Sequence, residues 1–112
     1  MMHGELWWAD FGVPLGSAAG YRRPAVIIQS DELIGTDINT VIVVPLTSNL
    51  RLAEYKPNIL LKSKATELNK DSVALPPLLT ALDKDCFIEK ISKLPKSVVD
   101  VVYEAVLEAL KY

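Results

Sequence analysis

Two adjacent arginines form the part of the sequence best suited to chemistry on a phosphate. Arg23 follows a glycine-rich stretch and precedes Pro24, whose ring fixes a backbone dihedral at the start of an apolar run. A guanidinium group can hold two phosphate oxygens at once and stays charged at any working pH. Arg23 could therefore grip a phosphodiester, although a surface arginine at the end of a strand fits the same pattern.

Hydroxyl and amide side chains follow a second apolar run, in the segment Thr47-Ser48-Asn49. The Thr47 hydroxyl is too weak an acid to release a full proton unaided, but it can donate a hydrogen bond to a phosphate oxygen. Closing a turn at the end of a strand would use the same hydroxyl. Aromatic rings that could stack on nucleobases stand at Trp8 and Tyr21. Trp7 and Trp8 are adjacent and face opposite sides of a strand, so we expect one of them in the core.

Charge is unevenly distributed along the chain. The formal net charge of −2 at pH 7 argues mildly against nonspecific binding to nucleic acid, which rests on a basic surface. The stretch from position 51 to position 70 nevertheless has an excess of basic residues, with Arg51, Lys56, Lys62, Lys64 and Lys70 against Glu54 and Glu67. A local basic groove is therefore compatible with a weakly acidic chain.

The sequence offers little for metal or disulfide chemistry. His3 is the only histidine and Cys86 the only cysteine, so we expect no metal, no cofactor and no disulfide within the chain. His3 stands next to the N-terminus, where we expect it to be a bystander rather than a general base. The single cysteine favours a reducing, cytoplasmic location. No apolar run approaches the roughly 20 residues that cross a bilayer, and the N-terminus does not resemble a signal peptide, so we expect no membrane association.

The elements that must position these residues are short. At 112 residues we expect one domain, residues 1–112. Runs of β-branched residues between polar or glycine-rich stretches predict a mainly β protein, a small barrel. We predict a long loop at 11–20, one helical turn from Ser30 to about Gly35, and strands at 5–9, 25–28, 41–44, 58–61, 72–75, 78–82 and 86–92.

The last segment has helical rather than strand periodicity. Pro95 is suited to open a helix, and apolar residues recur after it at helical spacing. We therefore expect an amphipathic C-terminal helix that packs on the barrel. Its expected core-facing residues are Val98, Val99, Val102, Tyr103, Val106, Leu107 and Leu110, with Asp100, Glu104 and Glu108 opposite.

An ordered set of motifs resembles the MazF/PemK family of toxins. The N-terminal half carries Gly4-Glu5-Leu6-Trp7-Trp8-Ala9-Asp10, Gly16-Ser17, Gly20-Tyr21-Arg22-Arg23-Pro24-Ala25-Val26-Ile27-Ile28-Gln29 and Val43-Val44-Pro45-Leu46-Thr47-Ser48-Asn49. Asp71-Ser72-Val73-Ala74, Leu82-Asp83 and the closing helix extend the likeness over nearly the whole chain. Each motif alone is common, but the ordered set is specific.

The resemblance implies an SH3-like, CcdB/MazF-like β-barrel that works as a homodimer. It also implies the toxin of a type II toxin–antitoxin system, an mRNA interferase that cuts single-stranded RNA at a short sequence without a metal. Inhibition by a cognate antitoxin belongs to the same implication. Arg23 and Thr47 stand at the family's catalytic positions. Arg22, Tyr21, Ser48, Asn49 and Trp8 are the candidates for RNA contacts.

RNA carries its own nucleophile for this reaction. Its 2′-OH lies beside the scissile phosphate, so the enzyme needs to orient the two groups, move two protons and stabilise the developing charge. The products would be a 2′,3′-cyclic phosphate and a 5′-OH end.

Two departures from the family pattern bear on activity. Many relatives have a glutamate, a candidate proton acceptor, where this chain has Ala18. Many also have a glutamine among polar neighbours where this chain has Leu75-Pro76-Pro77-Leu78. The general base is therefore unassigned, and the recognised RNA sequence is expected to differ from that of relatives. Two alternatives stay open: a CcdB-like toxin that poisons gyrase by binding it, and a catalytically degenerate SH3-like binding module.

Overall fold

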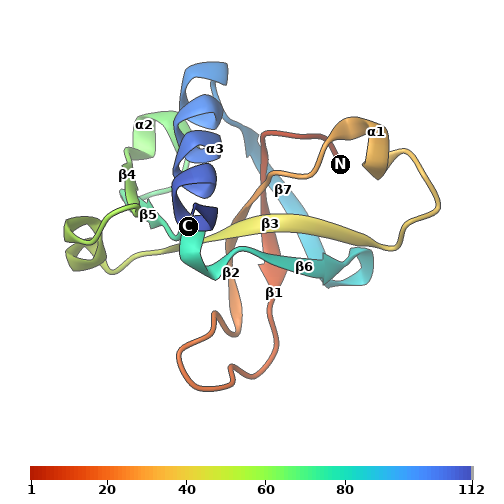
Figure 1. Ribbon diagram of the computed structural model, residues 1–112, viewed down its shortest axis with the longest axis horizontal. Coiled ribbons are helices and arrows are strands. Elements are labelled where there is room, and N and C mark those ends of the chain that lie inside the picture. Colours follow the sequence, from red (N-terminus) through yellow and green to blue (C-terminus); the bar gives the residue numbers. More distant parts are fainter. Residues whose placement is uncertain (112) are drawn as a thin grey trace.

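Seven strands form one antiparallel sheet in the computed structural model, which describes residues 1–111 (Figure 1). The strand order is β4-β5-β3-β2-β1-β7, and β6 pairs with β3. The strands are β1 (Glu5–Asp10), β2 (Arg22–Ile27), β3 (Thr40–Thr47), β4 (Ile59–Leu61), β5 (Ser72–Ala74), β6 (Thr80–Asp83) and β7 (Phe87–Lys93). The mainly β prediction is confirmed.

Three helices and three 3₁₀ turns complete the chain. The helices are α1 (Asp31–Ile34), α2 (Ser63–Thr66) and α3 (Lys96–Leu110), and the turns are η1 (Leu50–Glu54), η2 (Pro76–Leu78) and η3 (Lys84–Cys86). Within residues 1–111, none of the helices combines the length and the apolar character needed to span a membrane.

Strand β3 organises the sheet because it pairs with three other strands along its length. Residues 40–43 pair with β6, residues 43–45 with β2, and residues 46–47 with β5. The sequence predicted that this strand would end before Pro45, but it continues to Thr47. Proline removes only a donor from the ladder, and the Pro45 carbonyl still accepts a hydrogen bond from Leu75 N at 2.9 Å. This continuation brings Thr47 to the end of the strand.

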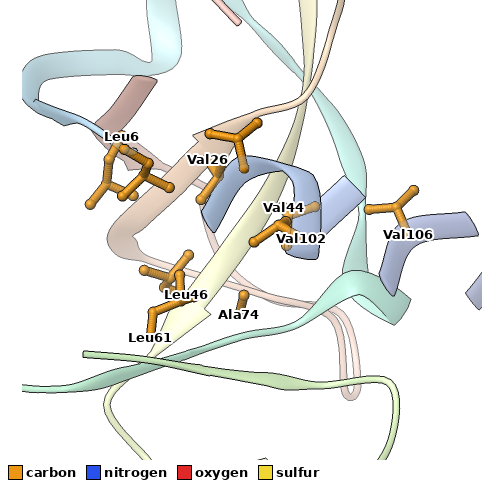
Figure 2. Close-up of a cluster of buried hydrophobic side chains, with 10 residues drawn as sticks. Leu6, Val26, Val44, Leu46, Leu61, Ala74, Val102 and Val106 are labelled. Atoms are coloured by element: carbon orange, nitrogen blue, oxygen red, sulfur yellow. The ribbon is translucent and has the colours of Figure 1, made fainter. Parts of the chain in front are cut away.

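The larger hydrophobic core lies between α3 and the sheet (Figure 2). Its buried members come from five strands, the segment before α3 and α3 itself: Leu6, Val26, Val44, Leu46, Leu61, Ala74, Leu94, Val99, Val102 and Val106. A second cluster on the other face of the sheet contains Ala9, Ala25, Ile27, Val41 and Val43. Alternation along β1, β2 and β3 therefore fills two cores, as expected for strands buried on both sides.

The buried face of α3 is narrower than predicted. Val99, Val102 and Val106 are buried, but Tyr103, Leu107 and Leu110 remain 45%, 44% and 63% exposed. The apolar residues of α3 extend around more of the helix than the barrel covers. The sequence prediction was therefore wrong for these three residues, which form a separate exposed stripe at i, i+4 and i+7.

The segment 78–82 also differs from the prediction of one strand. Pro76 and Pro77 lack N–H donors and lead into the turn η2, which takes Leu78, so that β6 begins only at Thr80. By contrast, α1 agrees with the predicted helical turn: Ser30 caps it by accepting from Leu33 N, and Gly35 ends it.

Candidate active site

The loop between β1 and β2 is closed at its base and holds Arg23. Phe11 N donates to Tyr21 O at 2.8 Å, and Tyr21 N donates to Gly12 O at 2.6 Å. Gly20 packs so tightly on Pro14 that a Cβ at position 20 would lie 2.4 Å from the proline ring. The Gly20 carbonyl then accepts a hydrogen bond from Arg23 Nε at 3.0 Å. The loop, at the bottom of Figure 1, thus fixes one side of the guanidinium.

Arg23 and Thr47 are brought together by the register of β2 and β3. Ala25 pairs with Pro45 in antiparallel fashion, and continuing that register by two residues sets Arg23 opposite Thr47. A terminal nitrogen of Arg23 donates to Leu46 O at 3.4 Å, which ties the guanidinium to β3 as well. The Thr47 hydroxyl oxygen accepts from Asn49 N at 3.2 Å, so its own hydrogen stays available for donation.

A cleft of about 400 Å³ opens beside these two residues. Its lining residues are Trp8, Arg22, Arg23, Pro24, Leu46, Thr47, Ser48, Leu68, Asn69, Lys70 and Ser72. Three of them are cationic and three carry hydroxyl groups, while no carboxylate of the described chain lines the cleft. Such a surface suits a polyanion, because bound phosphates accept charge-assisted hydrogen bonds and are not repelled by a neighbouring carboxylate of the described lining.

Five of the seven predicted site residues line this one cleft: Trp8, Arg22, Arg23, Thr47 and Ser48. Tyr21 and Asn49 are not among its lining residues. Tyr21 is 64% exposed beside Arg22, and the Asn49 side chain instead caps η1 by accepting from Arg51 N. We therefore place Tyr21 and Asn49 beside the cleft rather than in it.

The two tryptophans divide as the strand geometry requires. Trp7 packs on the second core, where its ring meets Phe87 edge to face at 6.1 Å, and its Nε1 donates to Glu5 at 2.9 Å. Trp8 lines the cleft. Of the two tryptophans, Trp8 is therefore the one at the cleft.

The sequence reasoning did not single out the other wall of the cleft, formed by Leu68, Asn69, Lys70 and Ser72. Leu68, Asn69 and Lys70 lie between α2 and β5, and Ser72 is the first residue of β5. No local pattern shows that this segment reaches the end of β3. The excess of basic residues from position 51 to 70 was the available signal, and Lys70 is its member in the cleft.

The two positions at which the chain departs from the family pattern, Ala18 and the segment 75–78, both contribute residues to a second pocket. Ala18 lines a pocket of about 310 Å³ together with Phe11, Pro77, Leu78 and others. Ala19, Leu79, Thr80 and Leu82 complete its lining, so among residues 1–111 it contains no group that titrates near neutral pH. The apolar residues at both positions thus form one surface, and the described residues of this pocket offer no carboxylate or imidazole as a proton acceptor.

The titratable groups near the N-terminus serve the fold. His3 N donates to Asp31, and its ring contacts Ile28 O at 2.9 Å, away from the residues that line the cleft. Burial raises the pKa of the Glu5 carboxyl, but hydrogen bonds from Trp7, Lys90 and Met2 N outweigh burial and set the pKa below its usual value. Within residues 1–111, no three His, Cys, Asp or Glu side chains gather closely enough to hold a metal ion.

Fold and cleft together define a small β-barrel, closed by one helix, whose cationic groove suits a phosphate-bearing ligand. MazF from Deinococcus radiodurans has the same fold, with a TM-score of 0.83 over 98% of this chain and 96% of that chain, at 22% sequence identity. An endoribonuclease from a mycobacterial species, solved in complex with its cognate antitoxin, superimposes with a TM-score of 0.77 over 98% and 94% of the two chains, at 16% identity. The SH3-like, MazF-like fold prediction is confirmed.

Residues 2–110 match the family described as PemK-like, MazF-like toxin of type II toxin–antitoxin system. The chain is also 36% identical to the endoribonuclease MazF6 of Mycobacterium tuberculosis over 98 residues, which cover 88% of this chain and 86% of the relative. This protein belongs to the PemK-like, MazF-like toxin family, as its motifs predicted.

Proposed function

We propose that this chain is an endoribonuclease toxin that cuts single-stranded RNA at a short sequence. The observation that carries the proposal is that Arg23 and Thr47 line one cleft, whose lining among residues 1–111 has three cations and no carboxylate. Family membership supports the same activity, since the relative MazF6 is named an endoribonuclease. The products are a 2′,3′-cyclic phosphate and a 5′-OH end.

Arg23 holds the scissile phosphate in this mechanism. Its Nε and one terminal nitrogen are already engaged by Gly20 and Leu46, so the remaining N–H groups have a fixed direction. A preorganised donor of this kind stabilises the charge that develops on the phosphorane oxygens. Thr47 donates a further hydrogen bond to a phosphate oxygen, because its hydroxyl hydrogen is not used by the fold.

The remaining cleft residues position the strand. Arg22, which is exposed, contributes a second charge for a neighbouring phosphate, and Trp8 offers a ring for stacking on an unpaired base. Ser48 supplies another hydroxyl, while Tyr21 and Asn49 contact RNA that extends past the cleft. The RNA provides the nucleophile itself, so these residues need no metal or cofactor for the attack.

The protein acts as a homodimer in the cytoplasm, and a cognate antitoxin inhibits it. Dimerisation is supported by the exposed stripe of Tyr103, Leu107 and Leu110 on α3, since a second copy would remove this apolar surface from water. Leu107→Asp should therefore shift the protein to monomer in analytical ultracentrifugation. An unchanged dimer would exclude this stripe as the interface. Antitoxin binding is supported by the related mycobacterial complex.

The test is digestion of a long unstructured RNA in EDTA, with mapping of the fragment ends. Wild-type protein should produce discrete fragments that end in cyclic phosphate, and Arg23→Ala should produce none. Arg51→Ala is the matched control, because Arg51 is an exposed arginine that lies in η1 and does not line the cleft. This control should cut like wild type.

Intact RNA after incubation with folded wild-type protein would refute the proposal. The CcdB-like gyrase poison and the degenerate binding module would then be the remaining alternatives. Equal cleavage by wild type and Arg23→Ala would support the ribonuclease activity but would show that Arg23 is not a catalytic residue.

A further inference from the structure

Among residues 1–111, three cationic side chains line the cleft, and one of them is suited to proton transfer. Cleavage needs a proton for the 5′-oxygen as it leaves. Among the residues that the structure describes, no Asp, Glu, His, Tyr or Cys lines the cleft. Arginine does not give up its proton in proteins, and serine and threonine hydroxyls are too weakly acidic. Lys70 is the lining residue whose side chain ends in an ammonium group, which carries three N–H donors at the end of a flexible stem.

The backbone around Lys70 is anchored on both sides. The buried Thr66 accepts from Ser92 Oγ through its carbonyl at 2.7 Å and from Leu68 N through its hydroxyl at 3.1 Å. On the other side, Asp71 accepts from Ser63 N at 2.8 Å. The segment 67–71 is therefore held against the barrel, with Lys70 at the cleft.

Sheet register brings this segment to the site. Strand β5 pairs with β3 so that Val73 lies opposite Thr47. Lys70 stands three residues before Val73, and Ser72 between them also lines the cleft. The flexible four-carbon stem of a lysine can move its ammonium group within this space.

The Lys70 ammonium is also not neutralised by the fold. Its sequence neighbour Asp71 instead forms an ion pair with Lys62 at 3.7 Å. Within residues 1–111, no carboxylate lies within ion-pairing distance of Lys70, and its side chain is exposed. Lys70 thus keeps its donors for a ligand.

We propose that Lys70 is the general acid of the cleavage reaction, an inference that rests on the proposed ribonuclease function. The 2′-oxygen forms a bond to phosphorus and releases its proton to water, while the bond from phosphorus to the 5′-oxygen breaks. Lys70 gives one ammonium proton to that 5′-oxygen, which leaves as a hydroxyl group. The neutral amine then regains a proton from water. Arg23 and Arg22 stabilise charge but do not transfer protons.

The experiment compares two RNA oligonucleotides that contain the mapped cleavage site. One is ordinary RNA, and the other has sulfur in place of the bridging 5′-oxygen. A thiolate is a far better leaving group than an alkoxide, so the sulfur substrate needs no general acid. Single-turnover rates at saturating enzyme are measured for wild type, Lys70→Met, Lys70→Arg and the control Lys64→Met, an exposed lysine of α2 outside the cleft.

On ordinary RNA, both Lys70 variants should lose about 10²–10⁴-fold in rate, the usual contribution of a positioned general acid. On the sulfur substrate both should cleave nearly as fast as wild type. Lys64→Met should match wild type on both substrates.

Three results would overturn the assignment of Lys70. The first is full activity of Lys70→Arg on ordinary RNA, which would show that Lys70 contributes only its positive charge. The second is full activity of Lys70→Met on ordinary RNA. The third is a rate loss in either variant that is equally large on the two substrates. A folded wild type that cleaves neither substrate would refute the ribonuclease itself, and the inference with it.

Discussion

Replacing Arg23 with lysine asks whether catalysis needs the guanidinium fork or only a positive charge. The guanidinium donates to Gly20 O at 3.0 Å and to Leu46 O at 3.4 Å, so it bridges the β1–β2 loop and β3. A lysine ammonium keeps the charge, but it cannot reach both carbonyls and a phosphate in one planar arrangement. Arg23→Lys should therefore lose activity although no charge is lost.

The expected losses in stability and activity have different sizes. Two hydrogen bonds at about 1 kcal/mol each set the loss of unfolding free energy at about 1–2 kcal/mol. Removing one preorganised donor from a reacting oxyanion typically lowers the rate by about 10²–10³-fold, or about 2.7–4 kcal/mol. We expect a loss of that second size in kcat/KM, larger than the loss in stability.

The assay measures kcat/KM on an oligonucleotide with the mapped site, together with the thermal midpoint of each variant. Arg22→Lys is the matched control: Arg22 lines the same cleft and is exposed, so lysine should largely replace it. Arg23→Lys that cleaves as fast as wild type would refute the role of the fork. Equal losses of kcat/KM in Arg23→Lys and Arg22→Lys would show that the guanidinium of Arg23 has no special role compared with that of Arg22.

Four further predictions follow from burial, charge and pocket geometry. Val106→Asp should lower the unfolding free energy by several kcal/mol in denaturant titrations, because Val106 is 4% exposed; Val101→Asp, 49% exposed on the same helix, should not. Because the folded pKa of Glu5 is lowered, its contribution to stability is present above its unfolded pKa of about 4.3 and lost as pH falls through the folded pKa. The melting temperature should therefore fall in acid, and Glu5→Gln should reduce that acid-dependent part of the fall. Three cations in the cleft predict that log Kd for RNA rises with log salt at a slope of about 2, and Arg22→Ala should reduce this slope by about 0.7 in fluorescence titrations. Ala18→Glu should not speed cleavage, because position 18 lines the apolar pocket and not the cleft; a faster variant would show that the loop carries a carboxylate to the phosphate.

Local signals predicted most elements well. Ser30 and Gly35 bound α1 as expected, because capping depends on residues within one turn. Runs of β-branched residues located most of the strands for the same reason. The β3 boundary was missed at Pro45, where pairing with β2 and β5 extends the strand past a residue that usually ends one.

Which side chains are buried depends on packing between elements that are distant in the sequence, so the sequence alone did not predict it. An apolar stripe on α3 shows which residues can be buried, but only the shape of the sheet decides that Val102 is covered and Leu107 is not. The same holds for the two tryptophans of β1. Alternation demands opposite faces, but only packing against Phe87 assigns Trp7 to the core and leaves Trp8 to the cleft.

The sequence by itself determined the family and the main candidate residues, because ordered motifs around Arg23 and Thr47 are visible without coordinates. Tertiary structure alone decided which residues share a site. Arg23 and Thr47 meet through the register of β2 and β3, and Lys70 joins them through the pairing of β5 with β3. Strand register is set by burial and hydrogen bonding across the whole sheet, so no local window of sequence contains it.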